Sequence, residues 1–223
     1  MTCIVGFLDK KNGRTYIGAD SCGSNASVKR TRVDKKLFKL KDDLDALLGF
    51  TSSFRMGQLL MFAEGLTQYE DYIDKDSENE ECSEECDCKT ELETQMIKIE
   101  NMDLEQMVTT FVPNVANVLL DGGFATQNGE GLEGGVFMFA HKDKLYRIDC
   151  DFQVEETEES YNACGSGEPY ALGALNAIAD NEDIDIVEKI HIALQAAAKF
   201  NPHVEGPFYI MNTANDEVIK FDN

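Results

Sequence analysis

Thr2 is the residue whose type and position most directly suggest chemistry. If Met1 is removed, Thr2 carries both a hydroxyl and a free α-amine. An amine that titrates near neutral pH can accept the hydroxyl proton as the oxygen attacks a carbonyl carbon, so that one residue supplies nucleophile and base. The simpler interpretation is that Thr2 only begins a β-hairpin. The choice between the two depends on the rest of the chain.

A second group of reactive side chains lies in an acidic stretch at about residues 73–100. Cys82, Cys86 and Cys88 are close together there, and thiolates at such spacing can bind Zn²⁺ or a copper-group ion. A structural zinc site usually has four nitrogen or sulfur ligands and a paired Cys-x-x-Cys knuckle, and the sequence offers neither. We therefore expect an acidic, solvated insertion with free thiols rather than a metal site.

The net charge limits the classes of partner. The chain of 223 residues has 42 acidic and 20 basic residues, for a formal charge of −22. Nucleic acids and anionic membranes are bound by Lys and Arg, so we expect neither as a partner. No apolar run reaches membrane-spanning length, no secretory signal is present, and the seven cysteines show no disulfide framework, which predicts a cytoplasmic protein.

The elements that must position Thr2 are predicted as hairpins and helices. Residues 2–8 and 15–20 form a hairpin around the turn at Asn12-Gly13, followed by a polar loop at 21–34 that ends in a short strand. Further strands are expected at 37–40, 44–51, 134–140, 145–149, 152–154, 208–212 and 218–221. Helices are expected at 54–72, from 103 onward with a kink or break before Pro113, at 170–179 and at 185–199.

The order of these elements predicts the fold class. Strands follow one another as antiparallel hairpins rather than through strand–helix–strand crossovers, which argues against a Rossmann or barrel fold. Two antiparallel sheets stacked face to face, with helices on each outer side, would bury the apolar faces. We therefore predict an α+β protein built as a four-layer αββα sandwich. With no internal repeat and no clean linker, residues 1–223 are expected to form a single domain.

Several motifs occur together along nearly the whole chain outside the acidic insertion. They are Thr2 with its following strand, Gly18-Ala19-Asp20-Ser21, Lys35-Lys36-Leu37-Phe38, Leu48-Gly49-Phe50, Gly134-Gly135, Leu145-Tyr146-Arg147-Ile148-Asp149, and Gly165-Ser166-Gly167 with Pro169-Tyr170-Ala171. Each motif alone is weak, but their joint order is specific. The chain resembles the N-terminal-nucleophile hydrolases of the proteasome β-subunit kind, which include bacterial ring-forming threonine peptidases. That family has the same sandwich of two antiparallel sheets between helical layers.

The resemblance implies roles for five residues. Thr2 looks like the nucleophile, unmasked by removal of the residue before it. Lys36 matches a lysine whose ammonium lies beside the threonine hydroxyl, and Asp20 matches the carboxylate that keeps this lysine charged. Gly49 matches the residue whose backbone N–H points at the developing oxyanion, and Ser166 matches a serine that hydrogen-bonds the terminal amine.

The turn before the penultimate strand departs from the family pattern. Proteasome β-subunits usually carry an Asp and a Ser there in support of the amine, whereas this chain has Asn201 as a partial substitute. We interpret His203 in the same turn as a surface histidine rather than a catalytic base. Ser21-Cys22-Gly23 also lacks the basic residue that usually follows the Asp in this family.

Substrate selection is expected to come from the loop at 21–28 and from the strand at 47–53. Ser21, Leu47 and Ser53 are the candidate substrate-binding residues. Leu47 and Ser53 together favour a mostly apolar primary pocket.

The resemblance implies a threonine peptidase that forms an acyl-enzyme ester on Thr2, uses no cofactor or metal, and works within a homo-oligomeric ring on peptides or unfolded proteins. An ATP-driven unfoldase is a candidate partner. Two alternatives remain open: an amidase that uses the same chemistry on a small non-peptide amide, and an inactive ring-forming scaffold or binding protein of the same fold. Cys3 is the other candidate nucleophile, although it has no free amine and lies on the opposite side of the strand from Thr2.

Overall fold

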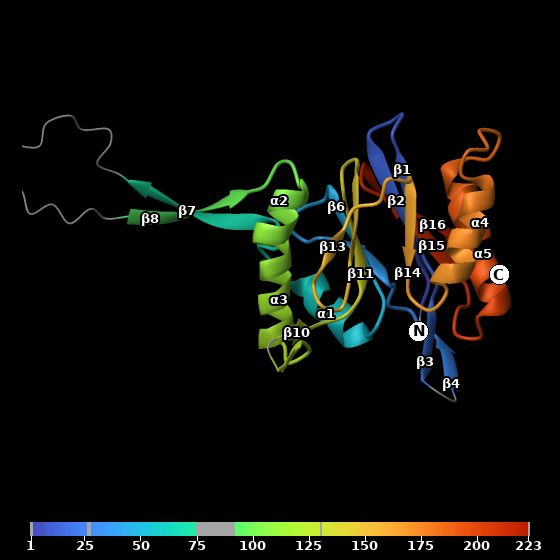
Figure 1. Cartoon of the computed structure of the whole chain (residues 1–223), viewed down its shortest axis with the longest axis horizontal. Coiled ribbons are helices and arrows are strands. Elements are labelled where there is room, and N and C mark those ends of the chain that lie inside the picture. Colours follow the sequence, from blue (N-terminus) through green and yellow to red (C-terminus); the bar gives the residue numbers. More distant parts are fainter. Residues whose placement is uncertain (1, 26–27, 75–91, 130, 223) are drawn as a thin grey trace, which may run out of the picture.

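Two antiparallel sheets form the centre of the molecule (Figure 1). The computed structural model describes residues 2–25, 28–74, 92–129 and 131–222. The first sheet has the order β14 (Tyr161–Cys164), β1 (Ile4–Asp9), β2 (Arg14–Ala19), β15 (Phe208–Asn212) and β16 (Asn215–Phe221). The second has the order β13 (Val154–Glu155), β12 (Lys144–Ile148), β11 (Phe137–His141), β6 (Ala46–Phe50) and β5 (Leu37–Lys39).

Helices lie at both ends of this pair of sheets (Figure 1). Helices α4 (Glu168–Ile178) and α5 (Ile186–Phe200) lie beside the first sheet. Helix α1 (Phe54–Phe62) and the consecutive segments α2 (Leu104–Gln106), η2 (Met107–Phe111) and α3 (Val112–Asp121) lie beside the second. The antiparallel sheets and the flanking helices agree with the sequence-based expectation of a mixed structure built from hairpins.

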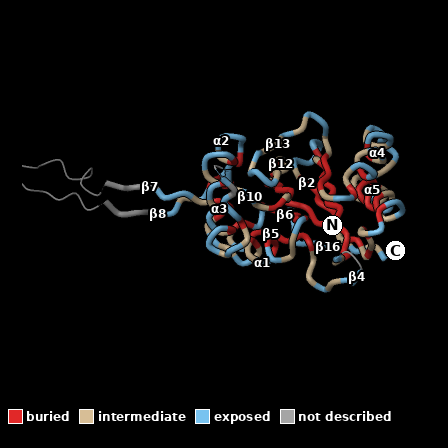
Figure 2. The backbone as a smooth tube through the Cα atoms, turned by 60° about the horizontal axis from the view of Figure 1, so that its bottom comes forward, coloured by how far each residue is buried: buried red, intermediate tan, exposed pale blue. Residues whose placement is uncertain are grey.

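Three apolar clusters fill the spaces between these layers, and the backbone there is buried (Figure 2). One lies between the second sheet and α1 and α3, and another between the first sheet and α4 and α5. The third, which contains Ile17, Leu47 and Met138, lies between the two sheets. Since burial of apolar side chains is the main favourable term in folding, these clusters fix the positions of the two sheets and the helices relative to one another.

Two helix boundaries follow from local chemistry. The side chain of Asp185 accepts a hydrogen bond from the Glu188 backbone N–H and caps α5, as the sequence predicts. The helix from Leu104 to Asp121 loses regular α-helical geometry before Pro113, in the π-helical segment η2. Proline lacks the N–H that an α-helix requires, so the predicted interruption is confirmed while the helix still continues.

The predicted helix over 54–72 is too long. Helix α1 ends at Phe62, and Gly65 follows with a φ of 76°, a conformation that favours glycine and does not continue a right-handed helix. The chain then forms β7 (Gln68–Asp74), which pairs with β8 (Leu92–Lys98) in a hairpin that projects from the layers (Figure 1). Cys82, Cys86 and Cys88 lie outside the described residues.

Two further hairpins were not expected from the sequence. Residues predicted as a loop with one short strand form β3 (Cys22–Asn25) and β4 (Val28–Thr31), which pair antiparallel near the N-terminus (Figure 1). β9 (Thr126–Asn128) and β10 (Gly131–Glu133) form the other. All four strands are short and consist largely of polar and small residues, so they lack the apolar alternation that marks a strand in a sequence.

Candidate active site

Thr2, Lys36 and Asp20 meet at one end of the space between the two sheets. The ammonium of Lys36 donates a hydrogen bond of 2.9 Å to Thr2 Oγ1 and lies 2.9 Å from each carboxylate oxygen of Asp20. All three residues are buried, with exposed fractions of 4% for Thr2 and 1% for the other two. The sequence-predicted trio is therefore brought together, with the lysine between the hydroxyl and the carboxylate.

Strand pairing brings these side chains together. Thr2 precedes β1 and Asp20 follows β2, and the pairing of Ile4 with Ala19 places the two strand ends side by side. Lys36 immediately precedes β5, and its carbonyl oxygen accepts a hydrogen bond from the Phe50 N–H of β6. The first sheet thus supplies the hydroxyl and the carboxylate, and the second sheet supplies the ammonium.

Both oxygens of the Asp20 carboxylate accept hydrogen bonds. Besides Lys36, it accepts hydrogen bonds of 3.0 Å from the backbone N–H groups of Cys3 and Cys22. Burial raises the pKa of Asp20, while the Lys36 ammonium and the two N–H donors act against this shift and favour the carboxylate. An ion pair buried with such additional hydrogen bonds keeps its geometry, because moving either partner would leave an unpaired charge in the interior.

The turn at Gly165-Ser166-Gly167 holds the backbone of Thr2. The Gly167 N–H donates a 3.1 Å hydrogen bond to the Thr2 carbonyl oxygen, and Ser166 Oγ lies 3.5 Å from the same oxygen. Gly165 has a φ of 97°, and a Cβ atom at this position would lie 2.4 Å from the Thr2 oxygen. Ser166 is thus beside Thr2 as expected, but the described contact is with the carbonyl oxygen, and its bond to the terminal amine stays a prediction.

Asn201 supports this turn from behind. Its side-chain amide donates a 2.6 Å hydrogen bond to the Ser166 carbonyl oxygen, and its side-chain oxygen accepts one of 2.9 Å from the His203 N–H. Asn201 is buried, so it fixes the Ser166 backbone rather than facing a substrate. His203 is half-buried in the turn and has no contact with Thr2, Lys36 or Asp20 among the described residues.

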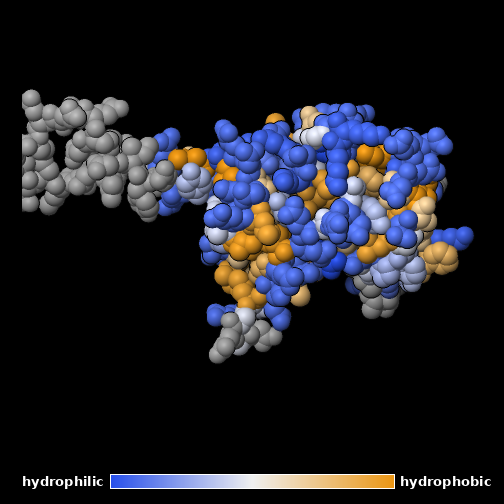
Figure 3. Space-filling view, turned by 45° about the horizontal axis from the view of Figure 1, so that its top comes forward, coloured by the Kyte–Doolittle hydropathy of each residue, from blue (hydrophilic) through white to orange (hydrophobic). Residues whose placement is uncertain are grey.

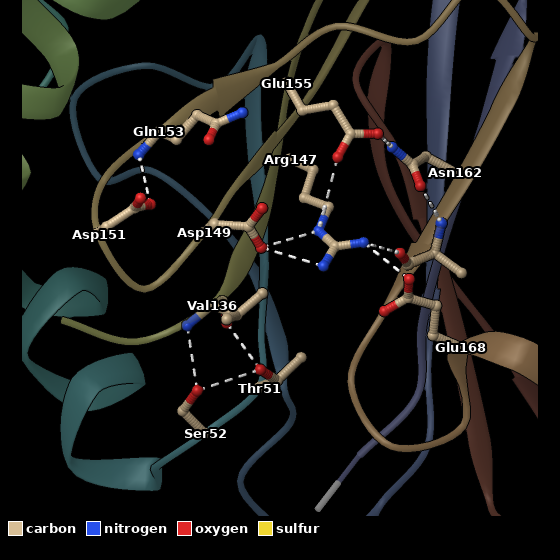
Figure 4. A network of polar contacts seen from close by, with 11 residues as sticks. Thr51, Ser52, Val136, Arg147, Asp149, Asp151, Gln153, Glu155, Asn162 and Glu168 are labelled. Carbon is tan, nitrogen blue, oxygen red and sulfur yellow. Dashed lines mark hydrogen bonds and ion pairs between the residues drawn. The ribbon is translucent and has the colours of Figure 1, made fainter. Parts of the chain in front are cut away.

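Arg147 connects the second sheet to the same turn (Figure 4). Its guanidinium lies 2.8 Å from Glu168, the first residue of α4, and 3.0 Å from Asp149, with Glu155 at 3.8 Å. Glu155 in turn accepts a 3.0 Å hydrogen bond from Asn162. The sequence motif at residues 145–149 contains Arg147 but indicates no role for it, and only the structure shows which carboxylates its guanidinium contacts.

Gly49 does not reach the site, so its predicted role is wrong. It lies within β6, paired with Leu37 of β5 on one side and Met138 of β11 on the other. A Cβ atom there would lie 2.8 Å from Ile4 Cγ2, in the packed space between the sheets. Glycine is required at this position by sheet-on-sheet packing, and its backbone is not at the cavity beside Thr2.

Ser52 is better placed to donate to an oxyanion. It has a φ of 55°, which is uncommon for a residue with a side chain and is typical of functional sites. Both the N–H and the hydroxyl of Thr51 donate to the Val136 carbonyl oxygen, and the Val136 N–H donates to Ser52 Oγ, so this conformation is held in place (Figure 4). Within the described part of the chain, the Ser52 N–H makes no hydrogen bond of its own.

A cavity of about 340 Å³ opens beside Thr2. It is bordered by the β3–β4 hairpin and by residues 50–54, including Ser52 and Ser53. The lining is mixed rather than mostly apolar: Arg30 and Arg32 line the cavity together with Phe50 and Phe54. Ser53 thus lies where a substrate-binding residue was expected.

Ser21 and Leu47 do not line the cavity. The Ser21 hydroxyl donates to the Pro207 carbonyl oxygen, and the residue is 1% exposed. Leu47 is fully buried between the two sheets. Alternate residues of a strand point to opposite faces, and Leu47 lies on the face of its strand that packs against the other sheet rather than on a face that lines the cavity.

Cys3 is not a competing nucleophile. It lies in the apolar cluster between the first sheet and helices α4 and α5, on the other side of β1 from Thr2. Burial raises the pKa of its thiol, which disfavours the reactive thiolate. In the described residues, no group of three or more His, Cys, Asp or Glu side chains is close enough to hold a metal ion, and no helix there is long and apolar enough to cross a membrane.

Comparisons with known proteins identify the fold. No family model and no curated protein matches the sequence. Among solved structures, Thiobacillus denitrificans BPH in complex with epoxomicin matches with a TM-score of 0.65 and 19% identity over 94% of this chain and 97% of that one. Trypanosoma brucei HslV matches with a TM-score of 0.58 and 15% identity over 95% and 98% of the two chains.

A third match is the Anbu (Gly-1) mutant from Hyphomicrobium sp. strain MC1, with a TM-score of 0.58 and 14% identity over 100% of this chain and 88% of that one. At identities of 14–19%, these likenesses concern the fold. The protein therefore has the fold of these structures, the proteasome β-like N-terminal-nucleophile hydrolase fold.

Proposed function

We propose that this protein is a threonine-type endopeptidase with Thr2 as its N-terminal nucleophile. We further propose that the chain is a single domain with the four-layer αββα architecture and that it acts in the cytoplasm. The observation that carries the proposal is the position of the Lys36 ammonium, 2.9 Å from Thr2 Oγ1 and bonded to the buried Asp20 carboxylate. A fixed positive charge next to a hydroxyl stabilises the negative charge that develops on its oxygen during attack.

Acylation begins once the bond between Met1 and Thr2 has been cut. The freed α-amine of Thr2 accepts the Oγ1 proton while Oγ1 forms a bond to the carbonyl carbon of the substrate peptide. The resulting oxyanion is stabilised by the Ser52 N–H. As the carbon–nitrogen bond breaks, the amine returns its new proton to the leaving amino group, and an ester on Thr2 remains.

Deacylation uses the same groups. The α-amine, neutral again, takes a proton from a water molecule as the water oxygen attacks the ester carbonyl carbon. The carbon–Oγ1 bond breaks, the proton passes to Oγ1, and the carboxylic acid product leaves. The Gly165-Ser166-Gly167 turn supports these steps by holding the Thr2 carbonyl oxygen, which restricts the position of the adjacent amine.

We further propose that the protein works as a homo-oligomeric ring, with peptides or unfolded proteins as substrates and an ATP-driven unfoldase as a partner. Apolar side chains gather on the helical layer formed by α1, α2, η2 and α3 (Figure 3), where Phe62, Leu104, Val108 and Leu120 are exposed. Exposed apolar patches of this kind favour contact with another protein surface. Light scattering would test this: a particle mass of one chain contradicts the ring.

Peptide cleavage by matched variants tests the proposed activity. Wild-type protein should hydrolyse fluorogenic peptides, and Thr2→Ala should lose this activity while keeping its circular dichroism spectrum and oligomeric state. Turnover that survives in Thr2→Ala would place the nucleophile elsewhere. Hydrolysis of simple amides but of no peptide would favour the small-amide amidase. A folded wild-type protein that hydrolyses neither would favour the inactive scaffold.

A further inference from the structure

The cavity beside Thr2 has a charge opposite to that of the protein as a whole. The chain carries a formal charge of −22, yet two arginines line this cavity and no Asp or Glu of the described chain does. In a protein with about twice as many acidic as basic side chains, two guanidinium groups without a lining carboxylate form a local environment suited to an anion.

The alternation of β4 places both arginines on the cavity side. Val28 and Arg30 are two residues apart on this strand, and Arg32 follows just beyond its end; all three line the cavity. Lys29 points the other way and lies 3.3 Å from Glu205. The strand period of two therefore separates the cavity-lining cations from the neighbouring surface lysine.

Arg32 forms a fixed wall of the cavity. Its side-chain stem lies against Gly23, where a Cβ atom would be 2.7 Å from Arg32 Cδ, and its guanidinium lies 3.8 Å from the centre of the Phe54 ring. Two hydrogen bonds of 2.7 and 2.6 Å join it to Asp34. Arg32 is held in place, and its charge is balanced by this carboxylate.

Arg30 supplies the unbalanced charge. It is exposed at the cavity and forms no ion pair within the described part of the chain. Its planar guanidinium can bind a carboxylate through two parallel hydrogen bonds, which gives directional recognition as well as attraction. With Arg32 already oriented nearby, the cavity is prepared for a negatively charged group.

We propose that this cavity binds a carboxylate of the peptide substrate, with Arg30 as the specificity-determining residue and Arg32 as a positioned second donor. The assignment rests on the proposed peptidase function and gives it a substrate class: peptides with a carboxylate close to the cleaved bond. The carboxylate is either an acidic side chain or a free C-terminus, and the two sources can be separated by experiment.

Binding to the folded Thr2→Ala chain tests the assignment without catalysis. Fluorescence anisotropy would compare acetylated, amidated peptides that differ only by Glu or Gln at one position, with that position moved along the peptide. If the bound carboxylate is a side chain, the best Glu peptide should bind roughly tenfold more tightly than its Gln counterpart, as expected for one charge-assisted contact. Adding Arg30→Gln should remove the difference. Adding Lys29→Gln instead, which removes the same charge from the other face of β4, should leave it unchanged.

A Gln peptide with a free C-terminus provides the second arm. Tighter binding of this peptide than of its amidated counterpart, abolished by Arg30→Gln, assigns the bound carboxylate to the chain terminus. Tighter binding of Glu than of Gln peptides, abolished by Arg30→Gln, assigns it to an acidic side chain. The proposal is overturned if neither Glu nor a free C-terminus tightens binding, or if the tighter binding survives Arg30→Gln.

Measuring peptide cleavage by the wild-type chain distinguishes a failure of the carboxylate-binding proposal from a failure of the proposed peptidase function. If Thr2→Ala prefers peptide carboxylates but the wild-type chain cleaves no peptide, the proposed peptidase function is contradicted while the proposed carboxylate-binding site is supported. If the wild-type chain cleaves Glu and Gln peptides at equal kcat/KM and Thr2→Ala shows no preference for a carboxylate, the peptidase function is supported and the role given to Arg30 is contradicted.

Discussion

The guanidinium of Arg147 lies 2.8 Å from the carboxylate of Glu168, and this contact joins the second sheet to the turn that holds Thr2. Arg147 comes from β12, whereas Glu168 is the first residue of α4 and follows the Gly165-Ser166-Gly167 turn directly. The position of Thr2 thus depends on a charged contact between parts of the chain that form separate layers.

Replacing Arg147 by Met should therefore affect both stability and catalysis. The change leaves Glu168, Asp149 and Glu155 without their shared cation, and we expect a loss of about 2 kcal/mol in the free energy of unfolding. Because the turn is then less well held, kcat should fall at a temperature where the variant is fully folded. Urea unfolding and steady-state kinetics measure the two effects. Adding Glu168→Gln should recover part of both; unchanged kcat in Arg147→Met would remove Arg147 as a positioning residue.

Replacing Lys36 by Met should abolish most of the activity. The substitution keeps the length of the side chain and removes the ammonium next to Thr2 Oγ1, for which we expect a fall in kcat of about 10²–10³-fold. It also leaves Asp20 buried without its cation, so the protein should be less stable. Lys35→Met, which alters the neighbouring lysine outside this contact, is the control. Comparable kcat values for the two variants would contradict the role given to Lys36.

Gly165 and Gly173 allow a matched test of the Thr2 backbone contact. In Gly165→Ala the new methyl group would collide with the Thr2 carbonyl oxygen, at a φ of 97° that alanine rarely adopts, so Tm should fall and activity should be lost. Gly173 lies within α4 with open space around it, and Gly173→Ala should raise stability by about 0.5–1 kcal/mol. Thermal unfolding of both variants checks this; equal Tm values would contradict the described contact.

Asp43 should make stability depend on pH in the acidic range. It is fully buried, 2.8 Å from Lys98 and 3.5 Å from His141. Burial alone would raise its pKa, but the contacts with His141 and Lys98 outweigh burial and lower the pKa from 3.8 to about 2. Because the pKa is lower in the folded state, the carboxylate stabilises the protein above about pH 4, and this contribution is lost as the pH falls toward about 2.

The size of this effect is about 2 kcal/mol, from the difference between the two pKa values. Urea unfolding of wild type and Asp43→Asn at several pH values would measure it: the advantage of wild type should shrink between about pH 5 and about pH 2.5. Asp45→Asn, an exposed carboxylate in the same turn, should show no such change. An advantage of wild type over Asp43→Asn that is constant with pH would refute the ionised, paired state of Asp43.

The parts of the site that were predictable from the sequence are those tied to strand ends. The family resemblance, not the strand pattern, assigned Asp20 and Lys36 their roles. Both residues, like Thr2, flank an apolar strand, and such strands are recognisable without a structure. Their convergence follows from the hairpin between β1 and β2 and from the stacking of the sheets. Asn201 likewise lies at the end of a strongly periodic helix.

The site predictions that were wrong or missing depend on the direction in which a residue faces. Gly49 and Ser52 are three residues apart, and the glycine was the natural candidate for close backbone approach. The structure uses Gly49 for packing between the sheets and holds Ser52 at a positive φ through Val136. That support comes from a distant strand, so nothing local in the sequence indicates it. Arg30 was missed for a related reason, since the polar β3–β4 hairpin carries no apolar alternation.

Intact-mass analysis of the purified protein before and after treatment with an epoxyketone peptide inhibitor, which reacts with a hydroxyl and an α-amine on the same residue, tests the central claim most directly. The account predicts that the untreated chain has lost Met1 and begins at Thr2, and that it then gains the mass of one inhibitor molecule. Thr2→Ala should gain none. A wild-type chain that retains Met1 and remains unmodified would contradict the proposal that Thr2 is an N-terminal nucleophile, since its amine would still be bound in a peptide.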